Sequence, residues 1–136
     1  MTVKRIEAAG QLLAIYLTGD DWPQGLAFYS DDADYVQVGT WNYERGKTLL
    51  AHRHKKALRE AERTQEVIFV KQGAVKADIY DGTDILVETV QMRAGDVLIL
   101  LNGGHGYHIL EDDTQVLEIK NGPYPGPEAD RERLKK

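Results

Sequence analysis

The sequence lacks cysteine altogether, and it has only two Trp, two Phe and four Pro among its 136 residues. Without cysteine, a disulfide framework, a cysteine-type zinc site and a thiol nucleophile are excluded. No apolar run approaches the roughly 20 residues that a membrane-spanning helix needs, and the start, Met-Thr-Val-Lys-Arg, has no apolar signal-peptide core. We therefore expect a cytoplasmic protein that has no membrane partner.

Positive charge is also in deficit, since 17 Lys and Arg stand against 22 Asp and Glu, giving a net charge of −5. An acidic balance with few aromatic side chains argues against a nucleic-acid partner. The length suits one domain, residues 1–136, that is large enough to bury a core.

What the sequence does contain is a series of short β-type segments separated by turn residues. Asp81-Gly82, for example, is typical of a hairpin turn between two alternating segments. Regularly spaced short strands predict an all-β antiparallel sandwich or barrel. The predicted strands are 12–18, 35–40, 43–54, 67–70, 75–80, 85–90, 97–101, 107–110 and 116–120.

Two segments depart from this pattern. Residues 55–63 are strong helix formers, which predicts either a short exposed helix or a long loop. Three of the four prolines lie at 123, 125 and 127, so residues 121–136 are predicted to form an extended C-terminal arm that ends in a charged, frayed tail.

The four histidines form two close pairs, and three of them suit a metal site. His52 and His54 are two residues apart, so on a strand both imidazoles point to the same face. Glu66 opens the next strand, and His105 begins a later one. Three imidazoles and one carboxylate suit one divalent transition metal ion, Zn, Fe, Ni, Mn or Co, with positions left open for water or substrate. The alternative is that the His-x-His pair is simply solvated on a strand.

His108 and Tyr107 flank this set. His108 has the opposite strand parity to His105, so we expect it on the other surface of the sheet, supporting the site or binding substrate instead of metal. Tyr107 shares the parity of His105, so its hydroxyl can reach a bound ligand; equally, it can be a core aromatic with its hydroxyl at the rim.

These residues resemble the first motif of the cupin family. That motif is Gly, five residues, His-x-His, a short gap, Glu, six residues and Gly. Here Gly46 precedes His52-Arg53-His54 by five residues, and six residues separate Glu66 from Gly73. The gap between His54 and Glu66 is longer than the family's usual one, so residues 55–63 correspond to an insertion.

The second cupin motif is matched in part. Gly95 opens it, but Leu101 replaces the proline, His105 arrives one residue early and Ile109 stands in place of the asparagine. The Gly-Gly-His-Gly sequence around His105 and the ending Glu118–Tyr124 also resemble a group of small bacterial cupins, some of which accompany cell-surface polysaccharide genes. The resemblance implies a cupin-type double-stranded β-helix, or jelly-roll barrel, over about residues 35–120.

Strand parity then predicts a mostly apolar barrel cavity with the metal at one end, suited to a small polar, carbohydrate-derived or carboxylate ligand. Its predicted lining is Thr48, Leu50, Ile68, Val70, Leu117 and Ile119. The candidate catalytic residues are Glu66 and Tyr107. The candidate substrate-binding residues are Thr48, Tyr107, His108, Arg59 and Arg63.

The basic segment 53–63 has two interpretations. It can attract an anionic substrate, or it can be a solvated helix with internal ion pairs, since Glu60 and Glu62 interleave with its cations.

Three functions are compatible with these residues. The first is a metal-dependent enzyme of the isomerase or oxygenase type, and the second is a metal-independent sugar-nucleotide ketoisomerase or epimerase. The third is a non-catalytic barrel that binds a small ligand. We also predict a homodimer, paired through residues 12–18 and 121–127.

Overall fold

The computed structural model describes residues 1–134, so Lys135 and Lys136, the end of the predicted C-terminal tail, lie outside the described residues. The chain is nearly all β. Its elements are β1 (Val3–Ala8), β2 (Gln11–Leu17), β3 (Gly25–Phe28), β4 (Gly39–Asn42), β5 (Glu66–Gln72), β6 (Ala74–Tyr80), β7 (Leu86–Arg93), β8 (Val97–Leu100), β9 (Gly104–Ile109), β10 (Gln115–Lys120) and α1 (Pro127–Asp130).

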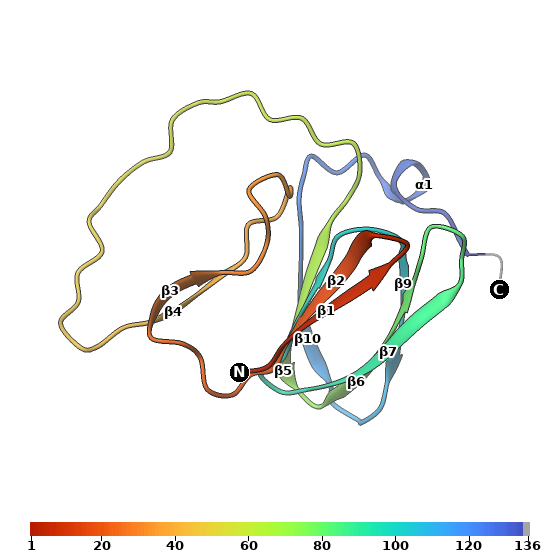
Figure 1. Ribbon diagram of the computed structural model, residues 1–136, viewed down its shortest axis with the longest axis horizontal. Coiled ribbons are helices and arrows are strands. Elements are labelled where there is room, and N and C mark those ends of the chain that lie inside the picture. Colours follow the sequence, from red (N-terminus) through yellow and green to blue (C-terminus); the bar gives the residue numbers. More distant parts are fainter. Residues whose placement is uncertain (135–136) are drawn as a thin grey trace.

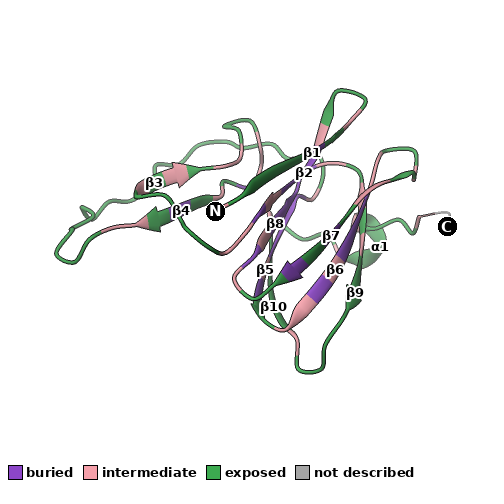
Figure 2. Ribbon diagram, turned by 60° about the horizontal axis from the view of Figure 1, so that its bottom comes forward, coloured by how far each residue is buried: buried purple, intermediate pink, exposed green. Residues whose placement is uncertain are grey.

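Two antiparallel sheets face one another. One has the order β1-β2-β8-β5-β10 and the other β7-β6-β9 (Figure 1). Between them lies the main core, to which both sheets contribute, for example Ile68 and Leu98 from the first and Val75 and Ile79 from the second. Buried residues accordingly concentrate on these strands (Figure 2). The all-β antiparallel prediction is confirmed, but the two sheets do not close into a barrel within residues 1–134.

The outer face of the five-stranded sheet carries a second apolar layer. Val36 packs there against Ile15, Leu17, Val67 and Ile99, with Tyr29 and Val38 beside it. Residues 29–38 therefore cover this face over β2, β8 and the start of β5. The predicted strand 35–40 is only partly correct, because the strand begins at Gly39.

From this layer the chain leaves the sandwich. Strands β3 and β4 form a separate two-stranded ribbon, and residues 43–63 follow as a long irregular segment that curves back to β5 (Figure 1). The predicted strand 43–54 is wrong for this structure, because no strand of residues 1–134 pairs with it. Of the two predictions for 55–63, the loop is correct. Nine residues without a packing partner are shorter than the roughly 12–15 that an isolated helix needs.

Most other predicted strands are confirmed within a residue or two, including 12–18 as β2 and 75–80 as β6. One of the last two predicted strands, 107–110, needs a change. It corresponds to β9, which begins at Gly104, three residues earlier than predicted, so that His105 lies inside the strand. Within residues 1–134 we find no helix with the length and apolar character to cross a membrane.

The C-terminal arm runs back over the end of the sandwich after β10. Asp130 in α1 accepts a hydrogen bond from Thr64, and Leu134 lies close to Gly104, where an added Cβ would meet its Cδ1 at 3.0 Å. The described part of the C-terminal arm therefore packs against the domain, and it contains the short helix α1.

Candidate functional site

Glu66 and His105 meet at one end of the sandwich. The Nε2 atom of His105 lies 3.1 Å from Oε2 of Glu66. The Glu66 side chain is 7% exposed and that of His105 is 32% exposed, so a buried carboxylate is contacted by an imidazole that solvent can still reach.

The strand register explains why these residues face each other. Glu66 pairs with Leu100 and shares its face of the sheet with Ile68, which is in the main core. His105 pairs with Ile79 of β6, another core residue. Because paired residues of neighbouring antiparallel strands point to the same face, both side chains project into the space between the sheets.

Tyr107 completes a group of three on the same face, as its predicted parity with His105 requires. It pairs with Ala77, its hydroxyl donates to Oε1 of Glu66 at 3.4 Å, and its ring centroid lies 5.2 Å from that of His105. Burial, together with the negative charges of Glu66 and Glu118, raises the pKa of its phenol above the ordinary value. The tyrosine is therefore a neutral hydrogen-bond donor at neutral pH.

Glu118 is a fourth member that the sequence analysis did not select. It pairs with Ile68 across β5 and β10 and so faces the same space, and its carboxylate lies 3.3 Å from Lys120 Nζ. A hydrogen bond with Glu66 raises the pKa of Glu118. Burial alone would raise the pKa of Glu66, but hydrogen bonds from His105 and Glu118 outweigh it and lower that pKa to about 2. Glu66 is thus the ionised partner of the carboxyl pair.

Glu66 is held in place by the residue that precedes it. Gln65 is 1% exposed, and its side-chain oxygen accepts hydrogen bonds from the backbone N–H groups of Tyr35 (2.7 Å) and Val36 (3.2 Å). Its own backbone N–H donates to the side chain of Asn121 at 2.6 Å. The start of β5 is therefore tied both to the outer layer and to the end of β10. Neither Gln65 nor Asn121 was expected from the sequence, since a single amide side chain carries no periodic pattern.

His105 is positioned by the glycine pair that precedes it. Gly103 has φ +75°, and a Cβ there would collide with the backbone oxygen of Tyr80. Only glycine combines that backbone conformation with so close an approach, and this turn starts β9 beside β6. Replacement of Gly103 is therefore expected to move His105.

His52 and His54 do not join this group. Both are exposed on the 43–63 segment, with ring centroids 5.1 Å apart, and His52 Nδ1 lies 3.0 Å from the carbonyl oxygen of Leu50. The two imidazoles are close to each other, as predicted, although on an irregular segment and not on a strand. Within residues 1–134, no three histidine or acidic side chains come together in a ready-made metal site.

Three candidate substrate-binding residues also lie on this segment or at its end. Thr48, Arg59 and Arg63 are exposed. Arg59 contacts only its local backbone, at the carbonyl oxygen of Ala57 (3.4 Å). Arg63 instead donates to Leu101 O at 3.2 Å and stacks over the ring of Tyr35. Arg63 therefore anchors the return of the chain to the sandwich.

His108 faces the opposite surface of the three-stranded sheet, as its parity predicts. Its Nε2 lies 3.2 Å from Oδ2 of Asp78, and Thr89 donates to Oδ1 of the same carboxylate at 2.7 Å. The hydrogen bond from Thr89, followed by the charges of Lys76 and His108, lowers the pKa of Asp78. His108 thus has its own acidic partner and does not touch Glu66 or His105.

The predicted cavity lining is partly wrong. Ile68 and Val70 face the core, but Leu117 and Ile119 pair with Phe69 and Val67 and lie on the outer face of the sheet. The strand register places Val116, Glu118 and Lys120 on the inner face instead. Parity within β10 could not be predicted because its apolar residues Val116, Leu117 and Ile119 occupy both faces of the strand. Thr48 and Leu50 are far from any such lining, on the exposed segment.

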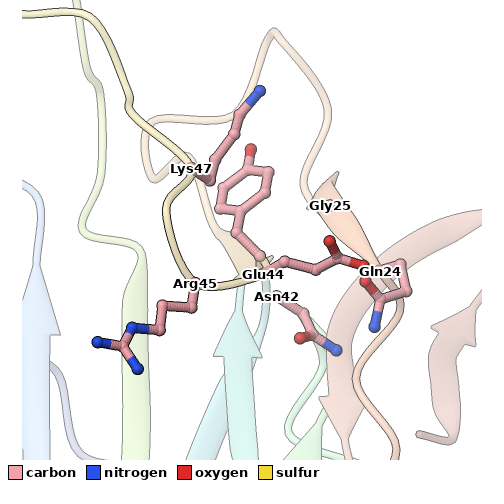
Figure 3. Close-up of a pocket in the computed structure, with 7 residues that line it drawn as sticks. Gln24, Gly25, Asn42, Glu44, Arg45 and Lys47 are labelled. Carbon is pink, nitrogen blue, oxygen red and sulfur yellow. The ribbon is translucent and has the colours of Figure 1, made fainter.

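A surface hollow of about 390 Å³ lies at the free end of the ribbon, and Glu66 is not among its lining residues (Figure 3). Its wall is polar and shallow, and Lys47 Nζ lies 5.7 Å from the ring centroid of Tyr43. The lining residues are Gln24, Gly25, Asn42, Tyr43, Glu44, Arg45 and Lys47. It has no buried ionisable group, so we do not place chemistry there.

The chemistry of the site rests on an imidazole nitrogen and a carboxylate oxygen at one point. Donor atoms bound to one ion at about 2.0–2.2 Å lie about 3 Å apart when they bind at right angles, close to the observed separation of 3.1 Å. Glu66 and His105 therefore fit two positions of a metal site, and a neutral Tyr107 can donate to a bound oxygen. Comparisons with family models, curated proteins and solved structures found no match to this chain.

Proposed function

We propose that this chain binds one divalent transition metal ion between β5 and β9, with Glu66 and His105 as two of its ligands and His52 and His54 as the others. The observation that carries the proposal is the approach of Glu66 to His105, two residues that their positions at strand starts predict as metal ligands. Nitrogen and oxygen donors of this kind suit Zn, Fe, Ni, Mn or Co.

The two missing ligands lie on a segment that can reach the site. His54 is twelve residues before Glu66, and extended chain spans up to about 3.5 Å per residue. Among the described residues, the hydrogen bonds of 48–60 are local ones, such as that between Arg59 and Ala57. Moving this segment against a sandwich, that of its own chain or that of a second copy, therefore breaks few contacts.

The same movement would complete the fold that the sequence resembles. Both β9 and β10 are edge strands, each with one free side within residues 1–134. Adding chain to those edges would close the two sheets into a cupin-type jelly roll, with the metal between them.

The bound ion would supply Lewis-acid polarisation of a ligand oxygen. Glu66, ionised and buried, holds negative charge at the ion's position. Tyr107 donates a hydrogen bond toward Glu66 and can turn to a ligand oxygen on the same face. We infer a small polar ligand, carbohydrate-derived or carboxylate, because the inner face around Tyr107 combines these donors with apolar neighbours such as Ala77, its partner on β6.

A titration of metal-stripped protein with Mn, Fe, Co, Ni and Zn tests the proposal. Wild type should bind one ion per chain, and Glu66→Gln and His105→Ala should each weaken binding at least 10-fold. His108→Ala is the matched control, since it removes an imidazole from the opposite face of β9 and should leave affinity unchanged. Unchanged affinity in both site variants would contradict the proposal.

A second candidate function needs no metal. Because Glu66, His105 and Tyr107 already contact one another, they form an acid–base group of the kind that moves a proton between adjacent carbons of a keto sugar nucleotide. This function predicts turnover of a keto-deoxysugar nucleotide that survives exhaustive chelation. Ligand binding that requires metal, without turnover, would instead favour the non-catalytic barrel.

A further inference from the structure

The 43–63 segment carries two leucine side chains that are almost fully exposed, although large apolar side chains are usually buried. Leu50 is 82% exposed and Leu58 is 92% exposed. Irregular stretches of more than about 12–15 residues are uncommon inside a compact domain, and they are usually either functional segments or linkers. The ribbon that leads into the segment adds an apolar face, since Leu26 pairs with Trp41, which is 62% exposed, and Phe28 lies on the same side.

The sandwich exposes a complementary surface, which we name the exposed inner face: residues of β9 and β10 that point between the sheets yet reach solvent. Ile109 is 63% exposed even though it pairs with the buried Val75. Its members are His105, Tyr107, Ile109, Val116 and Glu118. A core-facing isoleucine with that exposure indicates that a covering element is missing from the isolated chain.

Charge supports pairing of the segment with this surface. Residues 43–63 contain seven Lys and Arg against three Glu, a net charge of +4, so the remainder of the chain carries −9. Acidic side chains lie in and around the exposed inner face: Glu118 within it, Glu66 buried beside it on β5, and Glu111, Asp112 and Asp113 in the turn between β9 and β10. A basic segment and an acidic surface attract each other.

The path of the chain decides which copy supplies the segment. The root of the ribbon is fixed on the outer face of the five-stranded sheet by Val36 and Val38, and Tyr29 accepts or donates a 2.9 Å hydrogen bond with Thr40. Figures 1 and 2 both show the ribbon and the 43–63 segment on one side of the molecule and β9 on the other. The segment is therefore directed away from the exposed inner face of its own chain.

We propose that two copies exchange these segments, so that residues 43–63 of each copy add to the free edge of β9 in the other. This inference rests on the proposed metal site and makes it composite: His52 and His54 come from one copy, and Glu66 and His105 from its partner. Reciprocal exchange covers the exposed inner face of both chains at once. The addition of an extended segment to a sheet edge is an established mode of recognition. The segment and β4 together supply about the 20–30 residues a side of a standard interface.

Mixing two defective variants tests the exchange. One carries His52→Ala and His54→Ala, and the other Glu66→Ala and His105→Ala; they are unfolded together and refolded. Each alone should bind no metal ion. The mixture should recover roughly one ion per four chains, because half of randomly formed dimers are mixed and each holds one complete site. No recovery, with wild type still binding one ion per chain, would overturn the exchange but leave the metal site intact.

A crosslinking measurement keeps the inference testable even if wild type binds no metal. The chain has no cysteine, so a Leu50→Cys, Ile109→Cys double variant carries the only two thiols. A short bis-maleimide should join two chains into a covalent dimer at low micromolar concentration. A crosslinked product that migrates as a single chain would show that the segment folds back on its own sandwich, and it would overturn the exchange. The Leu50→Cys, Leu86→Cys variant, with its second thiol on β7, is the control and should give little of either product.

Discussion

The imidazole of His105 lies 3.1 Å from the carboxylate of Glu66, and the two residues come from edge-exposed β9 and interior β5 of different sheets. This contact links the two sheets at a point where a buried carboxylate meets an imidazole that solvent can reach.

The glycine before β9 should be required for the position of His105. We predict that Gly103→Ala lowers the free energy of unfolding by more than about 1 kcal/mol, because a Cβ strains a left-handed conformation and meets the backbone of Tyr80. Gly106→Ala is the control. Gly106 lies within β9 and no atom lies within 4 Å of the added Cβ, so this variant should keep the free energy of unfolding of wild type. Equal stability of both variants in urea unfolding would show that the turn does not need glycine.

Gln65 should stabilise the start of β5. Gln65→Leu leaves the N–H groups of Tyr35 and Val36 without their acceptor, and we predict a loss of about 2–3 kcal/mol in the free energy of unfolding. Gln91→Ala, at an exposed position of β7, serves as the control and should change it by less than about 0.5 kcal/mol. Chemical denaturation of both variants measures the difference, and a small effect for Gln65→Leu would argue against the anchor.

Asp96 should be the strongest polar link between β2 and the turn before β8. Its buried carboxylate accepts from Tyr16 Oη at 2.7 Å and from the N–H groups of Gly19 and Arg93 at 2.9 Å. Burial and the Asp96 hydrogen bond raise the pKa of Tyr16, so the phenol stays protonated as a donor. We predict that Asp96→Ala costs about 3 kcal/mol and Tyr16→Phe about 1 kcal/mol. A double-mutant cycle without coupling would contradict this assignment.

Asp78 should make stability depend on pH in the acid range. Its pKa is lowered in the folded state, so the folded protein binds that proton less well than the unfolded chain. The resulting stability is present above the unfolded pKa of about 3.9 and is lost as the pH falls through the folded pKa. The free energy of unfolding of wild type should exceed that of Asp78→Asn by about 1 kcal/mol at pH 7, and this margin should shrink progressively as the pH falls below about 3.9. Asp112→Asn, in an exposed turn, should show no margin at either pH; a constant margin for Asp78→Asn would contradict the prediction.

Much of the sandwich could be predicted from the sequence, because alternation in β6 and continuous apolar runs in β5 and β8 reflect burial directly. The site was half predictable. Parity within one strand correctly placed His105 with Tyr107 and opposite His108. Parity across strands failed for Leu117 and Ile119, because Val116, Leu117 and Ile119 are all apolar and only the pairing with β5 shows which of them point inward.

The placement of residues 43–63 could not be predicted for a different physical reason. Its His-x-His spacing and apolar residues are compatible with a strand, but a strand exists only where an edge pairs with it. In the isolated chain no described strand does so, and the segment extends away from the sandwich. Glu118 was missed because a charged residue in a strand is typical of an exposed face, and only the register shows that it points inward.

Elemental analysis of protein purified without added metal tests the central claim most directly. We predict one transition metal ion per chain in wild type and in His108→Ala, and none in the His52→Ala, His54→Ala double variant. Retention of one ion per chain in that double variant would contradict the site proposed here.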